Sequence, residues 1–204
     1  METKNDLNDN DRQRIKDGLW GKYARVSVTP NGLFRYPTGR DGLVGLRYDP
    51  DLVQDLPESA VGSYCGVGNP FSLGPIHAGE TVLDVGCGGG LDTMAAATLV
   101  SAGGRVVGMD MITEMLDRAK ENLLNFPLPN VTFLRATGED LPFSDETFNA
   151  AISNGVFNLI PDKAEAVAEV FRVLKPGGRL MIADQFLIGE SPDDKQIRID
   201  NWAK

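Results

Sequence analysis

The residues of this chain that most clearly predict chemistry lie in the stretch VLDVGCGGGLDT, at positions 82–93. Four glycines follow a run with the composition of a buried strand, and Asp84 stands two positions before the first of them. Glycine permits positive φ and close approach of a ligand, and a helix that begins there presents unpaired N–H groups. A carboxylate in such a turn would repel a pyrophosphate and attract an ammonium or sulfonium group. The stretch therefore predicts a loop that binds a cationic amino-acid nucleoside.

The spacing of these glycines distinguishes two ligand classes. Dinucleotide enzymes use G-x-G-x-x-G and set a pyrophosphate on the helix N-terminus. Here Gly86 and Gly88 are followed by Gly90, and Leu91 stands where the third glycine of that fingerprint would be. A nicotinamide-dependent dehydrogenase is an alternative interpretation, which the carboxylate of Asp84 disfavours.

A second carboxylate, Asp110, ends the next expected strand, twenty residues after Gly90. At this place in a nucleotide-binding sheet an acidic side chain accepts hydrogen bonds from the ribose hydroxyls. The structural alternative is that Asp110 is the N-cap of a helix over ITEMLDRAK. Loop and carboxylate together, in this strand order, favour the nucleoside interpretation.

These residues need a scaffold, and from residue 80 short apolar β-branched runs alternate with amphipathic runs of helical length. Such alternation predicts an α/β fold with a doubly wound, mostly parallel sheet whose strands are joined by crossover helices. Ligands of such sheets bind at the carboxyl ends of the strands. The expected strands are TVLDV, RVVGMD, VTFLRA, FNAAIS and RLMIADQFLI, and the expected helices cover about 91–102, 112–125 and 162–174.

Local signals set some of the boundaries. Asp162 followed by Glu165 resembles a capping box, for a helix that ends at VLKPGG before the fifth strand. Ser191 with Pro192 predicts the start of a last helix running to Lys204.

The N-terminal third has a different pattern. Residues 6–25 are polar with spaced apolar positions and predict an amphipathic helix. Residues 29–57 are rich in glycine and proline and predict an irregular cap with one short helix.

Composition narrows the function classes. The 204 residues are 42% hydrophobic and 24% charged, which is typical of a folded globular protein, and the net charge is −9. Without a block of lysine and arginine, we expect no nucleic acid and no membrane as partner. No run has the length of a membrane span and the start lacks a signal pattern, so a cytoplasmic protein is expected. Two cysteines and one histidine predict no metal site.

The motifs resemble those of the class I S-adenosylmethionine-dependent methyltransferases, over about residues 80–188. VLDVGCGGG is similar to their first motif, VVGMDM to the second, ATGEDLPFSDETFNAAISN to the adenine and fourth-strand region, and FRVLKPGGRL to the entry of the fifth strand. The resemblance implies a Rossmann-like fold and S-adenosylmethionine as cofactor. It places Asp84 and the loop at the methionine part, Asp110 at the ribose and Met111 on the adenine. The cofactor-binding residues expected in this way are Asp84, Gly86, Cys87, Gly88, Gly90, Asp110, Met111, Gly138, Glu139 and Asn154.

The adenine contact departs from the family pattern. In many relatives an acidic residue stands where this chain has Thr137, so the contact is expected to pass to the backbone of Gly138 and to Glu139 or Asp140. The structural alternative is that GEDLPFSDETF is only a solvated turn between strands.

A finer resemblance points to the arsenite methyltransferase group, through GVGNPFSLGPIHAGETVLDVGCGGGLD, GMDMITEML and SNGVFNLIPDK, with KYARV upstream. It implies that GVGNP and SNGVFNL flank the methyl-transfer pocket, with Tyr23, Val67, Asn69 and Gly155 as substrate-pocket residues. Arsenic requires soft thiolate ligands. The family's cysteine positions in these stretches hold Val67 and Gly155, so we expect this chain not to methylate arsenite efficiently.

The expected organisation has three parts: a helical and irregular cap at 1–79, the cofactor-binding domain at 80–190, and a C-terminal helix at 191–204 that is short for the family. The sheet would lack the family's last two strands. This leaves open a homodimer, a partner that supplies strands, or a shortened chain.

The predicted function is methyl transfer to a small-molecule methyl acceptor. None of Tyr23, Asn69 and Asn154 is a persuasive general base at neutral pH, so no catalytic residue is predicted. The alternative is a non-catalytic cofactor-binding module that needs a partner chain.

Overall fold

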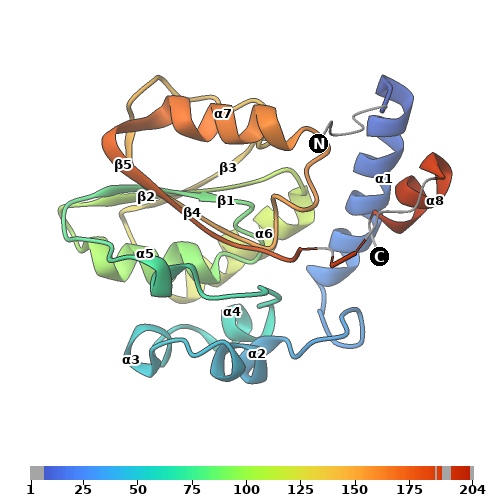
Figure 1. The fold of residues 1–204 in the computed structure, drawn as a ribbon. Coiled ribbons are helices and arrows are strands. Elements are labelled where there is room, and N and C mark those ends of the chain that lie inside the picture. The colour runs from blue at the N-terminus through green and yellow to red at the C-terminus, as the bar shows by residue number, and fades with distance from the viewer. Residues whose placement is uncertain (1–6, 187, 190–193, 203–204) are drawn as a thin grey trace.

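The computed structural model describes residues 7–186, 188–189 and 194–202. Its centre is a five-stranded parallel sheet in the order β3-β2-β1-β4-β5 (Figure 1). The chain moves outward from β1 to β3 and then returns to the other side of β1, so the direction of winding changes between β1 and β4. The predicted doubly wound parallel sheet is thereby confirmed. The strands are β1 (Thr81–Val85), β2 (Arg105–Asp110), β3 (Val131–Arg135), β4 (Phe148–Asn154) and β5 (Leu174–Ala183).

Helices cover both faces of this sheet. In Figure 1, α7 (Lys163–Val173) lies on one face, and α5 (Leu91–Val100) and α6 (Thr113–Asn125) lie on the other. Side chains alternate along β1 accordingly, because successive residues of a strand point to opposite faces. Leu83 packs in the cluster beneath α7, and Val82 packs against α5. Burial on both faces explains why the central strands are almost entirely apolar.

The boundary between α7 and β5 differs from the sequence expectation. The helix ends at Val173, and β5 begins at Leu174 and passes through Pro176, Gly177 and Gly178. The register against β4 shifts in this segment, and Gly177 has φ +77°. The proline and glycines that were expected to separate α7 from β5 therefore lie within β5, because a bulge accommodates them.

At its other end β5 is shorter than the predicted run to residue 188. The strand stops at Ala183, and the Asp184 carboxylate then accepts hydrogen bonds from the backbone N–H groups of Asn158 (2.9 Å) and Gln185 (2.7 Å). These bonds turn the chain out of the sheet, so Phe186 is exposed.

The predicted N-terminal helix is confirmed as α1 (Asp9–Val26), which begins with a capping box between Asn8 and Asp11. The cap after it is more helical than its glycine and proline content indicated. Pro50 and Pro70 stand in the first turn of short helices, where a missing N–H costs nothing. The short helices are α2 (Gly39–Gly45), α3 (Pro50–Val53), α4 (Glu58–Gly62) and the 3₁₀ helix η1 (Pro70–Leu73).

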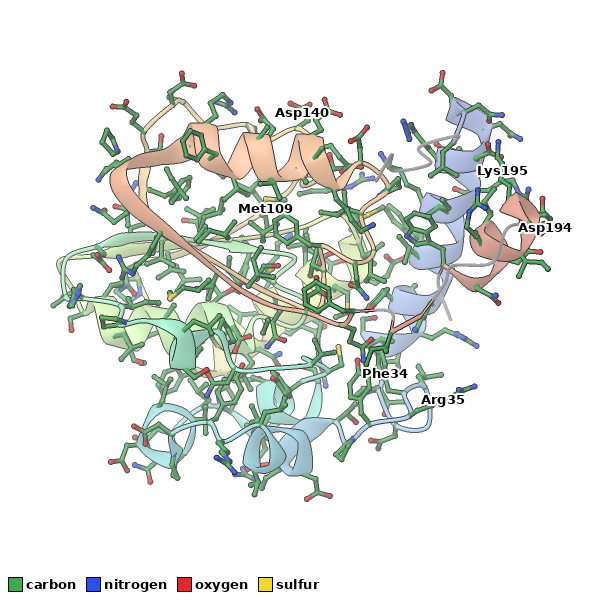
Figure 2. All side chains as sticks on the ribbon, viewed as in Figure 1. Phe34, Arg35, Met109, Asp140, Asp194 and Lys195 are labelled. Atoms are coloured by element: carbon green, nitrogen blue, oxygen red, sulfur yellow. The ribbon has the colours of Figure 1, made fainter. Side chains whose placement is uncertain are left out.

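The last helix, α8 (Lys195–Asn201), packs on α1 and not on the edge of β5. Its N-cap is Asp194, whereas the predicted cap residues Ser191 and Pro192, and the predicted end at Lys204, lie outside the described residues. Lys195 reaches Asp11 at 2.6 Å, and Figure 2 shows it at the start of α8 beside α1. Within the described residues β5 is therefore an edge of the sheet. None of the helices in those ranges is long and apolar enough to cross a bilayer.

Candidate functional site

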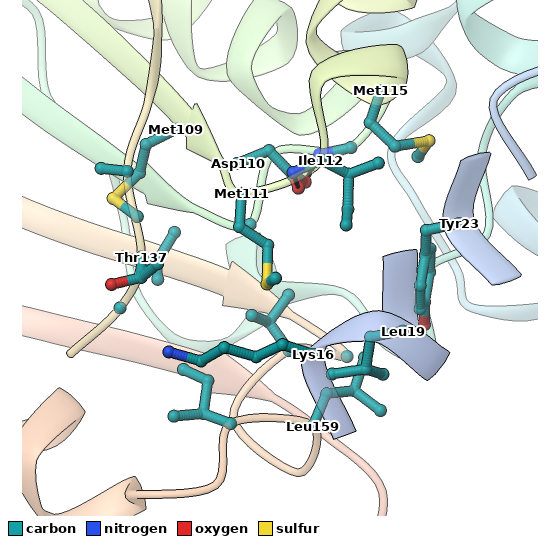
Figure 3. A pocket seen from close by; sticks show the side chains of 18 of the residues that line it. Lys16, Leu19, Tyr23, Met109, Asp110, Met111, Ile112, Met115, Thr137 and Leu159 are labelled. Carbon is teal, nitrogen blue, oxygen red and sulfur yellow. Dashed lines mark hydrogen bonds between the residues drawn. The ribbon is translucent and has the colours of Figure 1, made fainter. Parts of the chain in front are cut away.

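A cleft opens at the carboxyl ends of β1, β2 and β4, where the winding of the sheet reverses. Open parallel sheets bind ligands at this place. Its void amounts to about 820 Å³, which includes the part open to solvent. Figure 3 shows Asp110 and Met111 from the end of β2 facing Leu19 and Tyr23 from α1 across the cleft.

The glycine loop after β1 forms one wall. Gly86, Gly88 and Gly90 have φ of +75°, +52° and +84°, so each needs the freedom that was expected of it. The N–H groups of Gly86 and Cys87 both donate to the Met109 carbonyl at 2.8 Å, which fixes the turn against β2.

Packing within the protein also requires these glycines. A Cβ on Gly86 would lie 2.3 Å from Val156, and one on Gly90 would lie 2.8 Å from the Phe133 ring. Gly86 and Gly88 line the cleft, whereas Gly90 is the N-cap of α5 and does not. Close approach of a ligand, which was the reason inferred from the sequence, therefore explains these glycines only in part.

Asp110 fastens this loop. Its carboxylate accepts hydrogen bonds from the N–H of Gly88 at 3.0 Å and of Ile112 at 2.9 Å. Helix α6 begins at Thr113 with Ile112 as N-cap, so Asp110 is not the cap of that helix. Burial raises the pKa of Asp110, and the backbone hydrogen bonds oppose this.

The residues expected near an adenine also line the cleft. Met111, Thr137, Gly138 and Glu139 all line the cleft. Lys16 of α1 lies 3.7 Å from the Glu139 carboxylate. Helix α1 thus lies across the cleft and contributes both an ion pair and apolar side chains to it.

A smaller cavity lies on the other side of the glycine loop and contains two buried carboxylates. Asp84 accepts a hydrogen bond from the Thr93 hydroxyl at 2.6 Å. Asp92, in the first turn of α5, accepts from the Tyr48 hydroxyl at 2.8 Å and from Asn154 Nδ2 at 3.0 Å. The two side chains are 2% and 7% exposed.

The carboxylates of this cavity have no basic side chain beside them in its lining. None of the described residues that line it is a lysine, arginine or histidine. Burial raises the pKa of Asp92 to about 6, and burial together with the Asp92 charge raises that of Asp84.

Asp92 was missed by the sequence argument. The signal was available, because Asp92 and Thr93 are polar residues at the start of a helix that is otherwise almost entirely apolar and buried. A carboxylate at such a position needs partners from elsewhere in the fold.

Asn154 connects the cap to both cavities. Its Oδ1 accepts hydrogen bonds from the N–H of Val67 at 2.8 Å and of Gly68 at 3.1 Å, and its Nδ2 donates to Asp92. The amide predicted to contact the cofactor is thus engaged with protein groups, although the residue lines both cavities. Its position holds the loop around residue 67 over the sheet.

Of the predicted substrate-pocket residues, the structure brings three together. Tyr23 and Gly155 line the cleft, and the Val67 side chain lies 3.3 Å from where a Cβ of residue 155 would be. Asn69 is not at the cleft: its side chain caps η1 and donates to the Arg47 carbonyl. Cys87 lines the smaller cavity and not the cleft.

Two side chains of the cleft that could carry a proton, Tyr23 and Cys65, are poorly suited to act as a general base. Burial raises the pKa of the Tyr23 hydroxyl well above its ordinary value and that of the Cys65 thiol to about 12. His77 is exposed before the start of β1, at the opposite edge of the sheet. The lining is suited to holding a reactive ligand in position more than to moving protons.

Comparisons with known proteins agree with this geometry. The methyltransferase domain family matches residues 76–201. An arsenite methyltransferase from Halobacterium salinarum is 40% identical over 165 residues, which are 80% of this chain and 42% of that protein. A ubiquinone/menaquinone biosynthesis C-methyltransferase from Marinomonas sp. is 40% identical over 116 residues, which are 56% of this chain and 46% of that protein.

Among solved structures, an arsenic(III) S-adenosylmethionine methyltransferase from Chlamydomonas reinhardtii is similar with a TM-score of 0.61 and 35% identity. The similarity covers 66% of this chain and 47% of that one. The chain therefore spans less than half the length of these relatives.

Alanine substitutions at two glycines with similar φ can distinguish the cost of backbone strain from the cost of a steric clash. Gly86→Ala should lower the free energy of unfolding by about 1–2 kcal/mol for its positive φ and by a further 1–3 kcal/mol, roughly, for displacing Val156. Gly79→Ala is the matched control, because its φ is +83° and nothing lies within 4 Å of the added methyl group. Urea unfolding of both variants measures the difference. Equal losses would contradict the packing role of Gly86.

Ionisation of the buried Asp92 carboxyl should make the ligand-free protein less stable as the pH rises. Burial raises the pKa of Asp92 from its ordinary value of 3.8 to about 6 in the folded protein. The stabilisation that the protonated carboxyl gives the folded state is therefore full below pH 3.8 and is lost as the pH rises through about 6. The free energy of unfolding of Asp92→Asn, relative to that of the parent chain, should therefore rise by about 1–3 kcal/mol between pH 4 and pH 7. Urea unfolding across this range measures the gain, and a pH-independent difference between the two proteins would refute the prediction.

Proposed function

Because this chain belongs to the methyltransferase domain family, within the class I S-adenosylmethionine-dependent methyltransferases, we propose that it transfers the methyl group of that cofactor to a small, largely apolar molecule. One observation carries the proposal: the glycine loop, Asp110 and the two carboxylates of the smaller cavity lie together where the winding of the sheet reverses. When bound, the cofactor supplies an electrophilic methyl group on a sulfonium.

The residues present fit this cofactor. The Asp110 carboxylate accepts two backbone hydrogen bonds and retains acceptor capacity for the hydroxyls of a ribose. Met111, beside it, offers an apolar surface for a base, with Gly138 and Glu139 near its edge. The buried carboxylates favour the α-ammonium and sulfonium groups of the cofactor and would repel the pyrophosphate of a dinucleotide. This charge pattern supports the amino-acid nucleoside over the nicotinamide alternative.

The other side of the cleft supports an apolar acceptor. Leu19, Val156 and Leu159 line it, and the hydroxyl of Tyr23 is the polar group among them that could orient an acceptor. Since the sulfonium is already a strong electrophile, alignment of the acceptor behind the methyl group is the main task of these residues. Positioning of this kind contributes on the order of 7 kcal/mol in favourable intramolecular models.

Arsenite is not the acceptor we propose. Two of the relatives described above act on arsenic, and the resemblance assigns thiolate ligands to positions 67 and 155. The contact between Val67 and position 155 supports that mapping, since ligands of one arsenic atom must be neighbours. This chain has no thiol at either position, and Gly155 has φ +74°, which disfavours a side chain there.

The ribose role of Asp110 is tested by isothermal titration with S-adenosylhomocysteine. Asp110→Ala should weaken binding about 10- to 100-fold, because the nucleoside loses a charged hydrogen-bond acceptor and the glycine loop loses its hydrogen bond to Asp110. Asp145→Ala is a control, since Asp145 pairs with Arg172 at the surface, away from the cleft. Equal affinity of the parent chain and Asp110→Ala would remove the ribose assignment.

The acceptor class is tested with arsenite, glutathione and S-adenosylmethionine, and methylated arsenic is measured by mass spectrometry. We expect none above the background without protein, because the thiolate pair is missing. The Halobacterium enzyme, assayed in parallel, is the positive control.

Turnover of arsenite by this chain at a rate near that of the control would overturn the assignment. Formation of S-adenosylhomocysteine with any apolar acceptor would exclude the alternative of a non-catalytic binding module.

A further inference from the structure

We propose that Asp92 is a specificity-determining residue, which recognises the α-ammonium group at the amino-acid end of the cofactor and so distinguishes amino-acid nucleosides from nucleosides that lack this end. The inference rests on the proposed function, because it assumes that the nucleoside lies against the glycine loop. No motif in the sequence singled out this residue, and its role follows from what surrounds its carboxylate.

Asp92 does not act as a cap for its own helix. It stands in the first turn of α5, whose N-cap is Gly90, yet the donors to its two oxygens are the Tyr48 hydroxyl and the Asn154 amide. Tyr48 belongs to the N-terminal cap segment of the fold, and Asn154 lies at the end of β4. A side chain that only stabilised the helix would be expected to accept from N–H groups of the first turn.

The electrostatics of the smaller cavity call for a cation. Asp84 and Asp92 both line it, and their side-chain partners, Thr93, Tyr48 and Asn154, are all neutral. Two like charges in the interior repel each other and are costly without a countercharge. The described residues that line this cavity include no basic side chain. An ammonium group of a ligand would satisfy both carboxylates at once.

The position of Asp92 depends on the cap. The Tyr48 hydroxyl, which donates to Asp92, also lies 3.2 Å from the Tyr64 hydroxyl, and Asn154 holds the loop at Val67 and Gly68. The same hydrogen bonds that hold the cap on the sheet thus orient this carboxylate. Removing one donor should weaken recognition of the amino-acid end while the nucleoside wall at Asp110 is unchanged.

The test compares two ligands that share the nucleoside, S-adenosylhomocysteine and 5′-methylthioadenosine, by isothermal titration at pH 7.5. Asp92→Asn should weaken S-adenosylhomocysteine about tenfold and leave 5′-methylthioadenosine within about twofold. Tyr48→Phe should show a smaller loss, about threefold, for the first ligand only. Asp162→Asn is the matched control, because that carboxylate caps α7 outside both cavities.

Each outcome decides between the possibilities. Parallel weakening of both ligands, or no change in either, overturns the specificity role and leaves Asp92 as a structural residue. If Asp92→Asn does not fold, judged by circular dichroism, Tyr48→Phe decides on the same ratio of affinities. If the parent chain binds neither ligand, the proposed function fails, which is distinct from failure of this inference.

Discussion

The arrangement of this protein depends on the burial of carboxylates without basic partners. Asp84, Asp92 and Asp110 lie at the carboxyl edge of the sheet, and the hydrogen bonds that reach them come from neutral groups. Such groups reduce the cost of buried charge but do not cancel it. A ligand that brought a cationic group to this edge would offset the remaining cost.

The rest of the fold keeps these carboxylates in place. The central strands, buried on both faces, bring Asp84 and Asp110 to one edge of the sheet. The cap then contributes neutral donors such as Tyr48, and Asn154 at the end of β4 ties the cap to that edge. Stability and ligand recognition thus compete at one location, as is common where polar groups are arranged for function before a ligand arrives.

The sequence predicted the parts of the structure that follow from local periodicity. The first four strands and the position of Asp110 at the end of β2 were identified because apolar runs and polar termini are encoded locally. The start of β5 was missed because a bulge carries Pro176 through a strand. The bond from Asn69 to the Arg47 carbonyl was not anticipated because these residues are remote in sequence. Asp92 was overlooked for the same reason, since its partners are Tyr48 and Asn154.

The contact between α1 and α8 joins residues more than 180 positions apart, including Arg14 with Gln196 at 2.8 Å and Ile15 with Ile199. Contacts of such separation form late, because the intervening chain must first be ordered. During synthesis, the first helix leaves the ribosome long before its partner exists. One side of the binding cleft therefore stays without its outer support until α8 (Lys195–Asn201) has emerged and can pack on the first helix.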